Sequence, residues 1–309
     1  MSDTTPAPVL PEKPARRKTP LIAGGLVLVA ALAAGGWALI GGDDDSDVIR
    51  IGTTEASEPY WDILVEKAAA EGIDVEVVNF SEYTLPNPAL AEEEIDLNAF
   101  QHLLYLADHN VNTGEDLQPI GSTMIVPLPL YSEKYESVDE FVDGDQVAIP
   151  NDSTNQARAL FVLEAAGLIT FTGEPASPTP DDIDEDASTV VVRPVEASQT
   201  AGLIKDADVA GVIVNNNFAS DAGFDLDSYL YADDPESEGA QPYINIIAAR
   251  PGDLENETYQ KIVELYHEPE VLDAVVESSG GTAVIVEGYD STRLQEVLDK
   301  TEATLQSSN

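Results

Sequence analysis

The chain of 309 residues contains no cysteine, which excludes disulfide bonds, thiolate metal sites, a cysteine nucleophile and membrane attachment through a lipidated cysteine. Basic residues are also scarce: 14 lysines and arginines stand against 58 acidic residues, and the formal net charge is −44. A surface of that sign repels nucleic acid and anionic lipid, so neither is an expected partner. The excess of acid fits an adaptation to high salt and equally a heavily hydrated surface.

Motifs of common active sites and metal sites are missing as well. The sequence has no GxSxG elbow, no P-loop and no GxGxxG. Three histidines are present, but none stands in the HExxH spacing of a zinc site, and no D-x-D-x-D-G calcium loop occurs. We therefore expect neither an enzyme nor a bound cofactor, and no transition-metal site. The many carboxylates leave a hard-cation site open.

The N-terminal region has the pattern of a membrane anchor. Residues 1–18 are rich in proline and polar side chains and end in a basic cluster, which predicts a disordered cytoplasmic tail. Residues 19–42 carry no charge, and because about 20 apolar residues cross a bilayer core, they predict a transmembrane anchor. Residues 43–47 form an acidic linker. A cleaved signal peptide is the alternative, and both interpretations place the rest of the chain on the extracytoplasmic side.

From residue 48 onwards, strand-like and helix-like patterns alternate. VIRIGTT and IDVEVVNF predict strands, and PYWDILVEKAAAEG predicts a helix between them. The pattern restarts at QVAIP, which predicts a strand followed by the helix STNQARALFVLEAAG. Such alternation predicts an α/β fold with parallel sheets that are covered by helices on both faces.

The two runs of alternation predict two lobes. Strand-like segments near residues 126 and 243 are the expected crossings between them. One lobe would then comprise residues 48–129 and 236–309, and the other residues 130–235. Because ligands of open α/β sheets bind beyond the carboxyl ends of the strands, we expect a ligand cleft between the lobes.

Two of the three histidines lie in the stretch NAFQHLLYLADHN. On the predicted helix QHLLYLADHNV, His102, Tyr105 and His109 are spaced i, i+3 and i+7 and would share one face. The two histidines would be about 10 Å apart at ~5.4 Å per turn, which is too far for one metal ion. The face is either a half-buried stripe or the wall of a pocket, where rings would hold an apolar ligand group and an imidazole would make a hydrogen bond.

Polar side chains follow other predicted strands. In IPNDSTNQARALFVLEAAG, Asp152 or Ser153 is placed to cap a helix whose free N–H groups would face the crevice. Arg158 lies about one turn further and could hold a carboxylate, or form an ion pair with one of the many acids. Asn215 follows a buried strand in VIVNNNFASDAG, where its amide could accept from an ammonium group or simply form a turn. Asn245 lies among apolar residues in PYINI, where an unpaired amide would be costly. Together these residues predict a site for a zwitterion.

Four stretches, in order, resemble the NlpA-type methionine-binding proteins of ABC importers: EYTLPNPALAEEEIDLNAFQHLLYL, IPNDSTNQARALFVLEAAGLI, VIVNNNFASDAG and QPYINI. The resemblance implies a two-lobed periplasmic-binding-protein-like fold (type II) that closes on methionine, or in some members on another amino acid or a Met-containing dipeptide. It also implies an ABC permease and its ATPase as partners. Carried over by motif position, the implied ligand-binding residues are Tyr83, Phe100, His102 and Tyr105 at the thioether, Arg158 at the carboxylate, and Asn155, Asn215 and Asn245 at the polar end.

Two features depart from the family pattern. The family is typically anchored through a lipidated cysteine, which this chain lacks, so residues 19–42 would replace that anchor. The loop after the first strand often contains glycine in the family but reads TTEASEPYW here, which leaves its contact with the ligand and the ligand's identity open. Tyr60 or Trp61 could reshape the pocket. An extracellular hydrolase is a more distant alternative, because no nucleophile or metal-ligand set supports it. A surface adhesion protein is another, which does not account for the arginine and asparagine positions.

Overall fold

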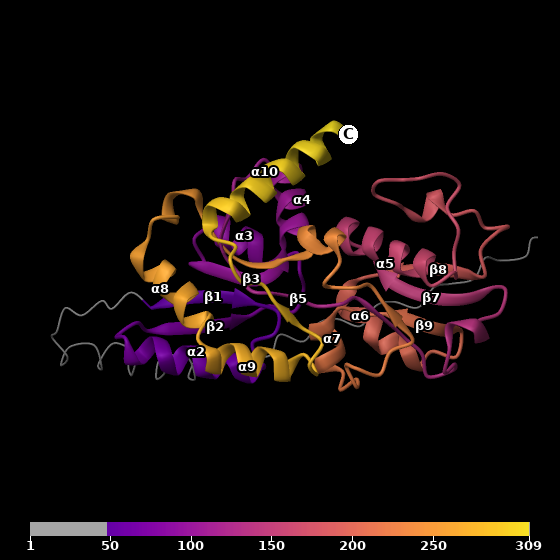
Figure 1. Ribbon diagram of the computed structural model, residues 1–309, viewed down its shortest axis with the longest axis horizontal. Coiled ribbons are helices and arrows are strands. Elements are labelled where there is room, and N and C mark those ends of the chain that lie inside the picture. Colours follow the sequence, from indigo (N-terminus) through magenta and orange to yellow (C-terminus); the bar gives the residue numbers. More distant parts are fainter. Residues whose placement is uncertain (1–47, 309) are drawn as a thin grey trace, which may run out of the picture. The chain divides into compact units, whose positions relative to one another are not determined.

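The computed structural model describes residues 48–308. The expected cytoplasmic tail (1–18), transmembrane anchor (19–42) and linker (43–47) therefore lie outside the described residues. Within the described part of the chain, no helix combines the length and the apolar character needed to span a membrane. Figure 1 shows two sheets flanked by helices, which confirms the expected α/β class.

The first sheet, called sheet 1, has the strand order β2-β1-β3-β11-β4. Strand β1 pairs in parallel with β2 and β3, whereas β11 runs antiparallel to both β3 and β4. The sheet is therefore mixed, and the expectation of an entirely parallel sheet is wrong, because β11 arrives from far along the chain and inserts between two earlier strands. The strand bounds are Ile49–Thr53 (β1), Val75–Asn79 (β2), Leu97–His102 (β3), Gln118–Ser122 (β4) and Asn245–Ala249 (β11).

The second sheet, called sheet 2, has the order β10-β6-β9-β7-β8. Strand β7 is parallel to β8 and β9, and β6 and β10 add antiparallel pairs at one edge. A small antiparallel ribbon joins β5, Met124–Ile125, to β12, Val284–Ile285. The bounds in sheet 2 are Pro129–Tyr131 (β6), Asp145–Pro150 (β7), Val190–Val195 (β8), Val209–Ile213 (β9) and Tyr231–Ala232 (β10).

The chain passes between the sheets twice. It leaves sheet 1 after Ser122 and enters sheet 2 at Pro129, and it leaves sheet 2 after Ala232 and returns to sheet 1 at Asn245. The first connecting segment contributes Val126 to the pocket described below, and Tyr243 of the second packs against Arg158 of the pocket wall.

The helices show how local sequence signals set their ends. Helix α2 begins with Pro59, whose fixed φ suits the first helical position. Helix α4 ends at Gly114, which adopts the left-handed conformation (φ 79°) that glycine tolerates best. Helices α7 and α10 were not expected from the sequence. The bounds are Pro59–Ala70 (α2), Pro86–Ala91 (α3), Leu103–Thr113 (α4), Ser153–Ala165 (α5), Ala197–Thr200 (α6), Asn216–Asp221 (α7), Glu257–Tyr266 (α8), Pro269–Ser278 (α9) and Ser291–Ser308 (α10).

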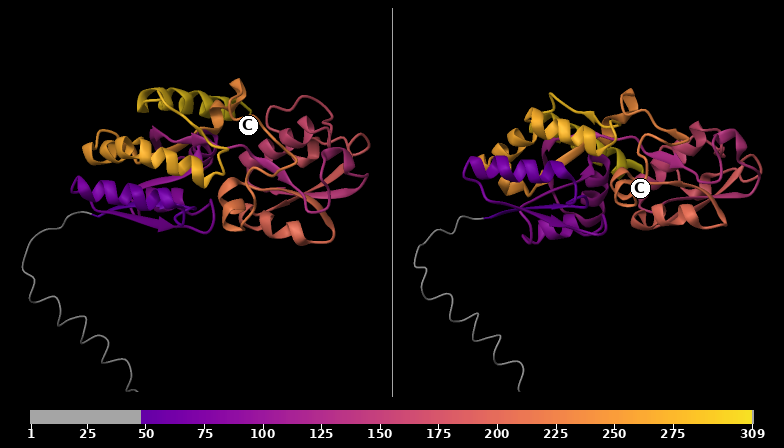
Figure 2. Two further views of the ribbon diagram at one scale, coloured as in Figure 1. Left: turned by 60° about the horizontal axis from the view of Figure 1, so that its bottom comes forward. Right: turned by 90° about the horizontal axis from the view of Figure 1, so that it is seen from below.

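Strand β11 is buried on both faces, and its side chains alternate between two hydrophobic cores. Ile247 and Ala249 pack with residues of α2, α8 and α9, whereas Ile246 and Ala248 pack with residues of α3, α4 and α10. Figure 2 shows these two groups of helices on opposite faces of sheet 1. The apolar run INIIAA therefore reflects a strand covered on both sides.

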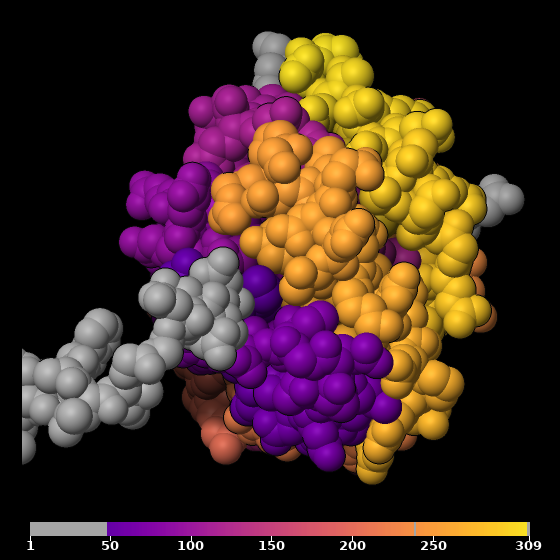
Figure 3. Space-filling view, turned by 90° about the vertical axis from the view of Figure 1, so that its left-hand side faces the viewer, coloured from indigo at the N-terminus to yellow at the C-terminus, as the bar shows by residue number. Residues whose placement is uncertain are grey.

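One face of sheet 1 is covered by segments from both ends of the described chain. Helix α2 packs against α8 and α9, although α8 and α9 follow sheet 2 in the sequence. Figure 3 shows α2 in indigo next to the orange segment that contains α8. The hydrophobic core on this face of sheet 1 is therefore completed only after the chain has passed through sheet 2.

The close packing of α8 on β4 can be tested at Gly121. A Cβ atom there would lie 2.6 and 2.9 Å from the two γ-carbons of Val263, a β-branched side chain with little rotamer freedom. We expect Gly121→Ala to lower the free energy of unfolding by about 1–3 kcal/mol through overpacking. Urea denaturation followed by circular dichroism measures this.

Gly173→Ala is the matched control, because no atom lies within 4 Å of its added methyl group. It should leave the urea midpoint almost unchanged. A Gly121→Ala midpoint equal to that of the wild type would contradict the packing account.

Candidate ligand-binding site

A pocket lies where the ends of sheet 1 and sheet 2 face each other. It contains about 560 Å³ of space between atoms, part of it open to solvent. The structure brings all eight residues expected to bind a ligand to its wall: Tyr83, Phe100, His102, Tyr105, Asn155, Arg158, Asn215 and Asn245. The other lining residues are Thr54, Glu55, Gln101, Met124, Val126, Asn216 and Asn217, of which Asn216 and Asn217 belong to the same asparagine run as Asn215.

A group of aromatic rings forms the apolar part of the wall. The ring centroid of Phe100 lies 6.0 Å from that of Tyr83 and 5.8 Å from that of Tyr105. Phe218 of α7 closes the group from the side of sheet 2, 5.0 Å from Tyr83. Rings at these spacings and angles pack favourably with one another and present a rigid apolar surface.

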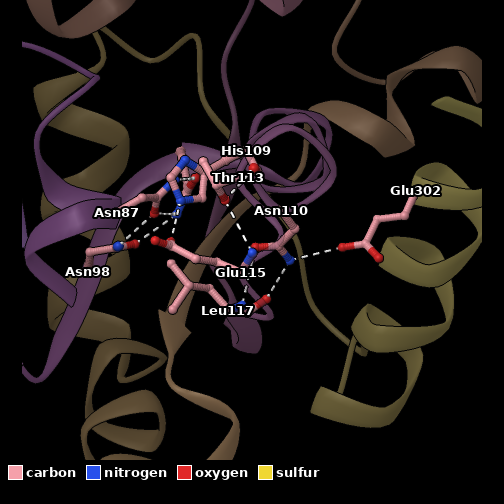
Figure 4. A network of polar contacts seen from close by, with 9 residues as sticks. Asn87, Asn98, His109, Asn110, Thr113, Glu115, Leu117 and Glu302 are labelled. Atoms are coloured by element: carbon pink, nitrogen blue, oxygen red, sulfur yellow. Dashed lines mark hydrogen bonds and ion pairs between the residues drawn. The ribbon is translucent and has the colours of Figure 1, made fainter. Parts of the chain in front are cut away.

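A buried amide network supports the end of β3. Gln101 Nε2 donates to Asn87 Oδ1 at 2.6 Å and to Asn98 Oδ1 at 2.9 Å, and Asn87 Nδ2 donates back to Gln101 Oε1 at 2.8 Å. Figure 4 shows the amides of Asn87 and Asn98 pointing toward each other, where Asn98 Nδ2 donates to Asn87 Oδ1 at 2.9 Å. Because all three residues are almost fully buried, each bond also avoids the cost of an unpaired amide. The network holds Gln101 in the pocket wall.

The helix that carries Tyr105 is fixed at its far end. Asn110 of α4 donates through Nδ2 to the Leu117 carbonyl and to Glu302 of α10, both at 2.9 Å (Figure 4). His109, one residue earlier, pairs with Glu115 at 2.7 Å and does not line the pocket. The two histidines therefore do not share one environment: His102 lies in the pocket wall, and His109 makes a hydrogen bond with Glu115 away from it.

His102 ends β3 and caps α4, which begins at Leu103, two residues later than the predicted helix that started at Gln101. Its Nδ1 accepts a hydrogen bond from the Tyr105 N–H at 3.0 Å. Burial, and then the charge of Arg158, lower the pKa of His102 to about 3; the Asn155 amide acts in the opposite direction without offsetting them. The ring is therefore neutral at pH 7 and carries its proton on Nε2. This Nε2 is buried and has no hydrogen-bond partner among residues 48–308.

A chain of three side chains orients the opposite wall. Asp152 caps α5, as one of the two expected candidates, and accepts from the backbone N–H and from Nδ2 of Asn155, both at 3.0 Å. Asn155 Oδ1 in turn accepts from Asn215 Nδ2 at 3.0 Å. The amide of Asn215 must therefore present its Oδ1 elsewhere, and this buried atom has no partner in the described part of the chain. The pocket thus contains a free buried donor on His102 and a free buried acceptor on Asn215.

Arg158 is buried and already ion-paired. Its Nε donates to Asp233 Oδ2 at 2.6 Å, its Nη2 donates to the Val126 carbonyl at 2.8 Å, and its Cζ lies 4.2 Å from the centre of the Tyr243 ring. Its Nη1 makes no hydrogen bond with residues 48–308. The ion pair considered in the sequence is therefore present, and Arg158 also lies in the pocket wall. No local sequence signal marks Asp233 as its partner, because Asp233 lies in an acid-rich stretch of the chain.

Asn245 stands opposite His102 in the pairing of β11 with β3. Its side-chain Nδ2 donates to the Met124 carbonyl at 3.2 Å, and its backbone carbonyl accepts from the Thr123 N–H at 2.8 Å. The expected cost of an unpaired amide is therefore avoided, and the side chain is held at the pocket edge.

Hydrogen bonds join the two walls directly. The Tyr83 hydroxyl donates to Asn217 Oδ1, and Asn217 Nδ2 donates to Thr54 Oγ1 at 3.3 Å. Ser153 of α5 donates to Asp108 of α4 at 2.9 Å on another part of the rim. These bonds hold the walls in contact around the cavity.

The loop TTEASEPYW does contribute to the wall, through Thr54 and Glu55. Tyr60 and Trp61 belong to α2, are almost fully buried, and line a smaller chamber behind the main pocket. Within residues 48–308, no group of three or more histidine, cysteine, aspartate or glutamate side chains is arranged to hold a metal ion.

The motifs that shape both walls fall within one region of family similarity. Residues 49–286 match the family described as NlpA lipoprotein. The chain belongs to the NlpA lipoprotein family. This confirms the resemblance seen in the sequence.

Individual relatives of this NlpA-family chain are similar over most of their length. It is 36% identical over 257 residues to the D-methionine-binding lipoprotein MetQ of Escherichia coli K12, which covers 81% of this chain and 93% of that protein. Protein PG110 from Staphylococcus aureus has 36% identity and a TM-score of 0.75, over 83% of this chain and 99% of PG110. A nutrient binding protein from Burkholderia cenocepacia, solved bound to methionine, has 29% identity and a TM-score of 0.71, over 77% and 99%. Two of these names describe methionine binding, and none describes catalysis.

The buried neutral state of His102 predicts a specific loss of stability in acid. Its pKa of about 3 in the folded protein lies below the ordinary value of 6.5, so the unfolded state binds more protons between these pH values and stability falls as the pH falls. Between pH 7 and pH 5 we expect the ligand-free wild type to lose about 2 kcal/mol more than His102→Gln. Urea unfolding at both pH values measures the difference.

His109→Gln, which changes a histidine outside the pocket, should leave this extra loss in place. Equal losses for wild type and His102→Gln would show that the ring is not held neutral.

Proposed function

We propose that this protein is an extracytoplasmic solute-binding protein that captures methionine and delivers it to an ABC permease. The observation that carries the proposal is the pair of unpartnered buried atoms in one pocket, the His102 Nε2–H donor and the Asn215 Oδ1 acceptor. A zwitterion brings an acceptor and a donor in one small molecule. The names of the Escherichia coli and Burkholderia cenocepacia relatives supply methionine as the first candidate.

In this proposal each part of the ligand meets a different part of the wall. The carboxylate accepts from Arg158 Nη1 and from His102 Nε2, and the ammonium group donates to Asn215 Oδ1. Asn155 and Asn245, which are oriented by the hydrogen bonds described above, fix the polar end of the ligand. The thioether lies against the aromatic rings of Tyr83, Phe100 and Tyr105, since a polarisable sulfur packs well beside aromatic rings.

Delivery would follow from closure of two lobes, residues 48–129 with 236–309 and residues 130–235. The hydrogen bonds between Tyr83 and Asn217, and between Ser153 and Asp108, are what the closed state of such a hinge would contain. A permease with its ATPase would recognise the closed form and receive the ligand.

Attachment to the membrane would be provided by residues 19–42, as a single-pass anchor with residues 1–18 in the cytoplasm and 43–47 as a linker. This assignment is supported by the uncharged span and by the absence of any cysteine that could carry a lipid. The binding domain would lie on the extracytoplasmic side of the cell membrane.

Another amino acid or a Met-containing dipeptide is the alternative ligand within the same class. The loop TTEASEPYW favours this alternative, because it places Thr54 and Glu55 in the pocket wall. A ligand longer than methionine would have to be accommodated along this part of the wall.

Calorimetric titration of ligand-stripped protein tests the proposal, with L-Met, D-Met, Gly-Met, leucine and glutamine as ligands. We expect Arg158→Ala to weaken binding by about 2–5 kcal/mol, because the ligand carboxylate would lose a buried cation and face the unpaired charge of Asp233. His102→Asn should weaken binding less, because an amide can still donate a hydrogen bond.

Arg193→Ala is the matched control, since this exposed arginine of β8 pairs with Asp206 at 3.3 Å and does not line the pocket. It should bind as the wild type does. Binding by Arg158→Ala within a factor of ten of the wild type would contradict the carboxylate assignment, and no binding of any amino acid or dipeptide would contradict the function.

A further inference from the structure

Glu55 brings a carboxyl group into the pocket wall. It lies two residues beyond β1, in the turn before α2, where its carbonyl accepts from the Glu58 N–H at 3.0 Å. Its side chain lines the main pocket and also the smaller chamber behind it, so it stands at the junction of the two. The site described above does not use this carboxyl group.

The charges in the pocket wall do not balance without a cationic group. Apart from the neutral His102, the ionisable acid and base that line the pocket are Glu55 and Arg158. The Arg158 charge is matched by Asp233 at 2.6 Å. Glu55 forms no ion pair with any lysine, arginine or histidine among residues 48–308. An ionised Glu55 therefore lacks a cation in a poorly hydrated wall, which is costly unless a ligand supplies one.

The groups around Glu55 do not supply a positive charge either. The Tyr60 hydroxyl of α2 makes a hydrogen bond with its carboxyl group, while Glu58 and Asp221, from the two sides of the pocket rim, repel its charge. The phenol rings of Tyr83 and Tyr266 are its other titratable neighbours. Burial, opposed by the Tyr60 bond and reinforced by the two acids, raises the pKa of Glu55 to about 7.

We propose that Glu55 is a ligand contact that accepts a hydrogen bond from the ammonium group of the captured amino acid. An ammonium group has three N–H donors, so it can donate to Glu55 and to Asn215 Oδ1 at the same time. Glu55 thereby selects ligands that carry an amine over those that carry only a carboxylate. This inference rests on the proposed capture of an amino acid and names the residue that reads its amine.

This contact makes the affinity for the ligand depend on pH, and the direction of the dependence follows from the charge of the ammonium group. A bound ammonium group stabilises the ionised carboxyl, so the pKa of Glu55 falls on binding and a proton is released. Affinity is then highest above pH 7 and decreases below it. Between pH 8 and pH 6 we expect the affinity for L-Met to fall about tenfold, as a single group with a free-state pKa near 7 requires.

The test is calorimetric titration of the ligand-stripped full chain at pH 6, 7 and 8. L-Met is compared with 4-(methylthio)butanoate, which keeps the thioether and carboxylate but lacks the amine. For the wild type we expect the tenfold fall with L-Met and no fall with the amine-free compound. Glu55→Gln should bind L-Met with little dependence on pH, and should bind it more weakly than the wild type at pH 8.

Two further variants make the result specific. Glu66→Gln removes a negative charge from an exposed position of α2 and should behave as the wild type. Tyr60→Phe removes the hydrogen bond that lowers the pKa of Glu55, so the midpoint of the pH dependence should move to higher pH. If Glu55→Gln does not fold, Tyr60→Phe decides, and an unchanged midpoint overturns the proposal.

The outcomes separate this inference from the function on which it rests. No binding of L-Met or of any related ligand by the wild type at any pH overturns the proposed function. Binding of L-Met with the same pH dependence in wild type and Glu55→Gln overturns the role of Glu55 alone. An equal loss of affinity for L-Met and for the amine-free compound in Glu55→Gln would show a structural role and would also overturn it.

Discussion

The hydrogen bond from the Tyr105 N–H to His102 Nδ1 determines the polarity of the pocket. It uses the lone pair of Nδ1, so the neutral ring must carry its proton on Nε2 and present a donor to the cavity. The same bond caps α4 at the point where β3 ends, so one interaction sets a helix start, a tautomer and the direction of a side chain. Burial keeps the ring from taking a second proton, and it therefore stands beside Arg158 without adding charge.

The opposite wall depends on a similar constraint that begins with a carboxylate. Asp152 can only accept hydrogen bonds when ionised, so Asn155 must turn its NH₂ group toward it and its oxygen away. That oxygen accepts from Asn215 and leaves the Asn215 oxygen facing elsewhere. Each amide orientation follows from the previous one, and the two walls consequently offer a donor and an acceptor to the same space. Bonds between Tyr83 and Asn217 then hold the walls together.

The charge of the buried Arg158 is matched by groups of the protein itself. Removing a guanidinium from water is expensive, and Asp233, the Val126 carbonyl and the Tyr243 ring together offset that cost. With its charge matched inside the protein, Arg158 adds little net positive charge to the pocket wall. The other ionisable acid or base in the wall besides His102 is the acid Glu55, in keeping with the acidity of the whole chain.

Sequence patterns located the elements and much of the pocket wall. Hydrophobic periodicity, proline at a helix start, an aspartate cap and glycine at a helix end act between residues that are close in the chain, so β1, α2, β7 and α5 could be predicted. Polar residues placed just after such strands and helix starts, such as Arg158 and Asn215, were found for the same reason. The full set of eight pocket residues was implied by the resemblance to the NlpA family, and all eight line one pocket.

How these elements meet depends on contacts between segments that are far apart in the chain. The insertion of β11 between β3 and β4, the choice of Asp233 as the partner of Arg158 across 75 residues, and the direction of the Glu55 carboxyl have no local signal. Each depends on which faces of the two sheets bury their apolar side chains and on which polar atoms must then find partners. Patterns along the chain place particular polar residues at the ends of strands. The packing of distant segments sets which of their atoms face the pocket, because an unpaired buried polar atom costs free energy wherever the fold leaves it.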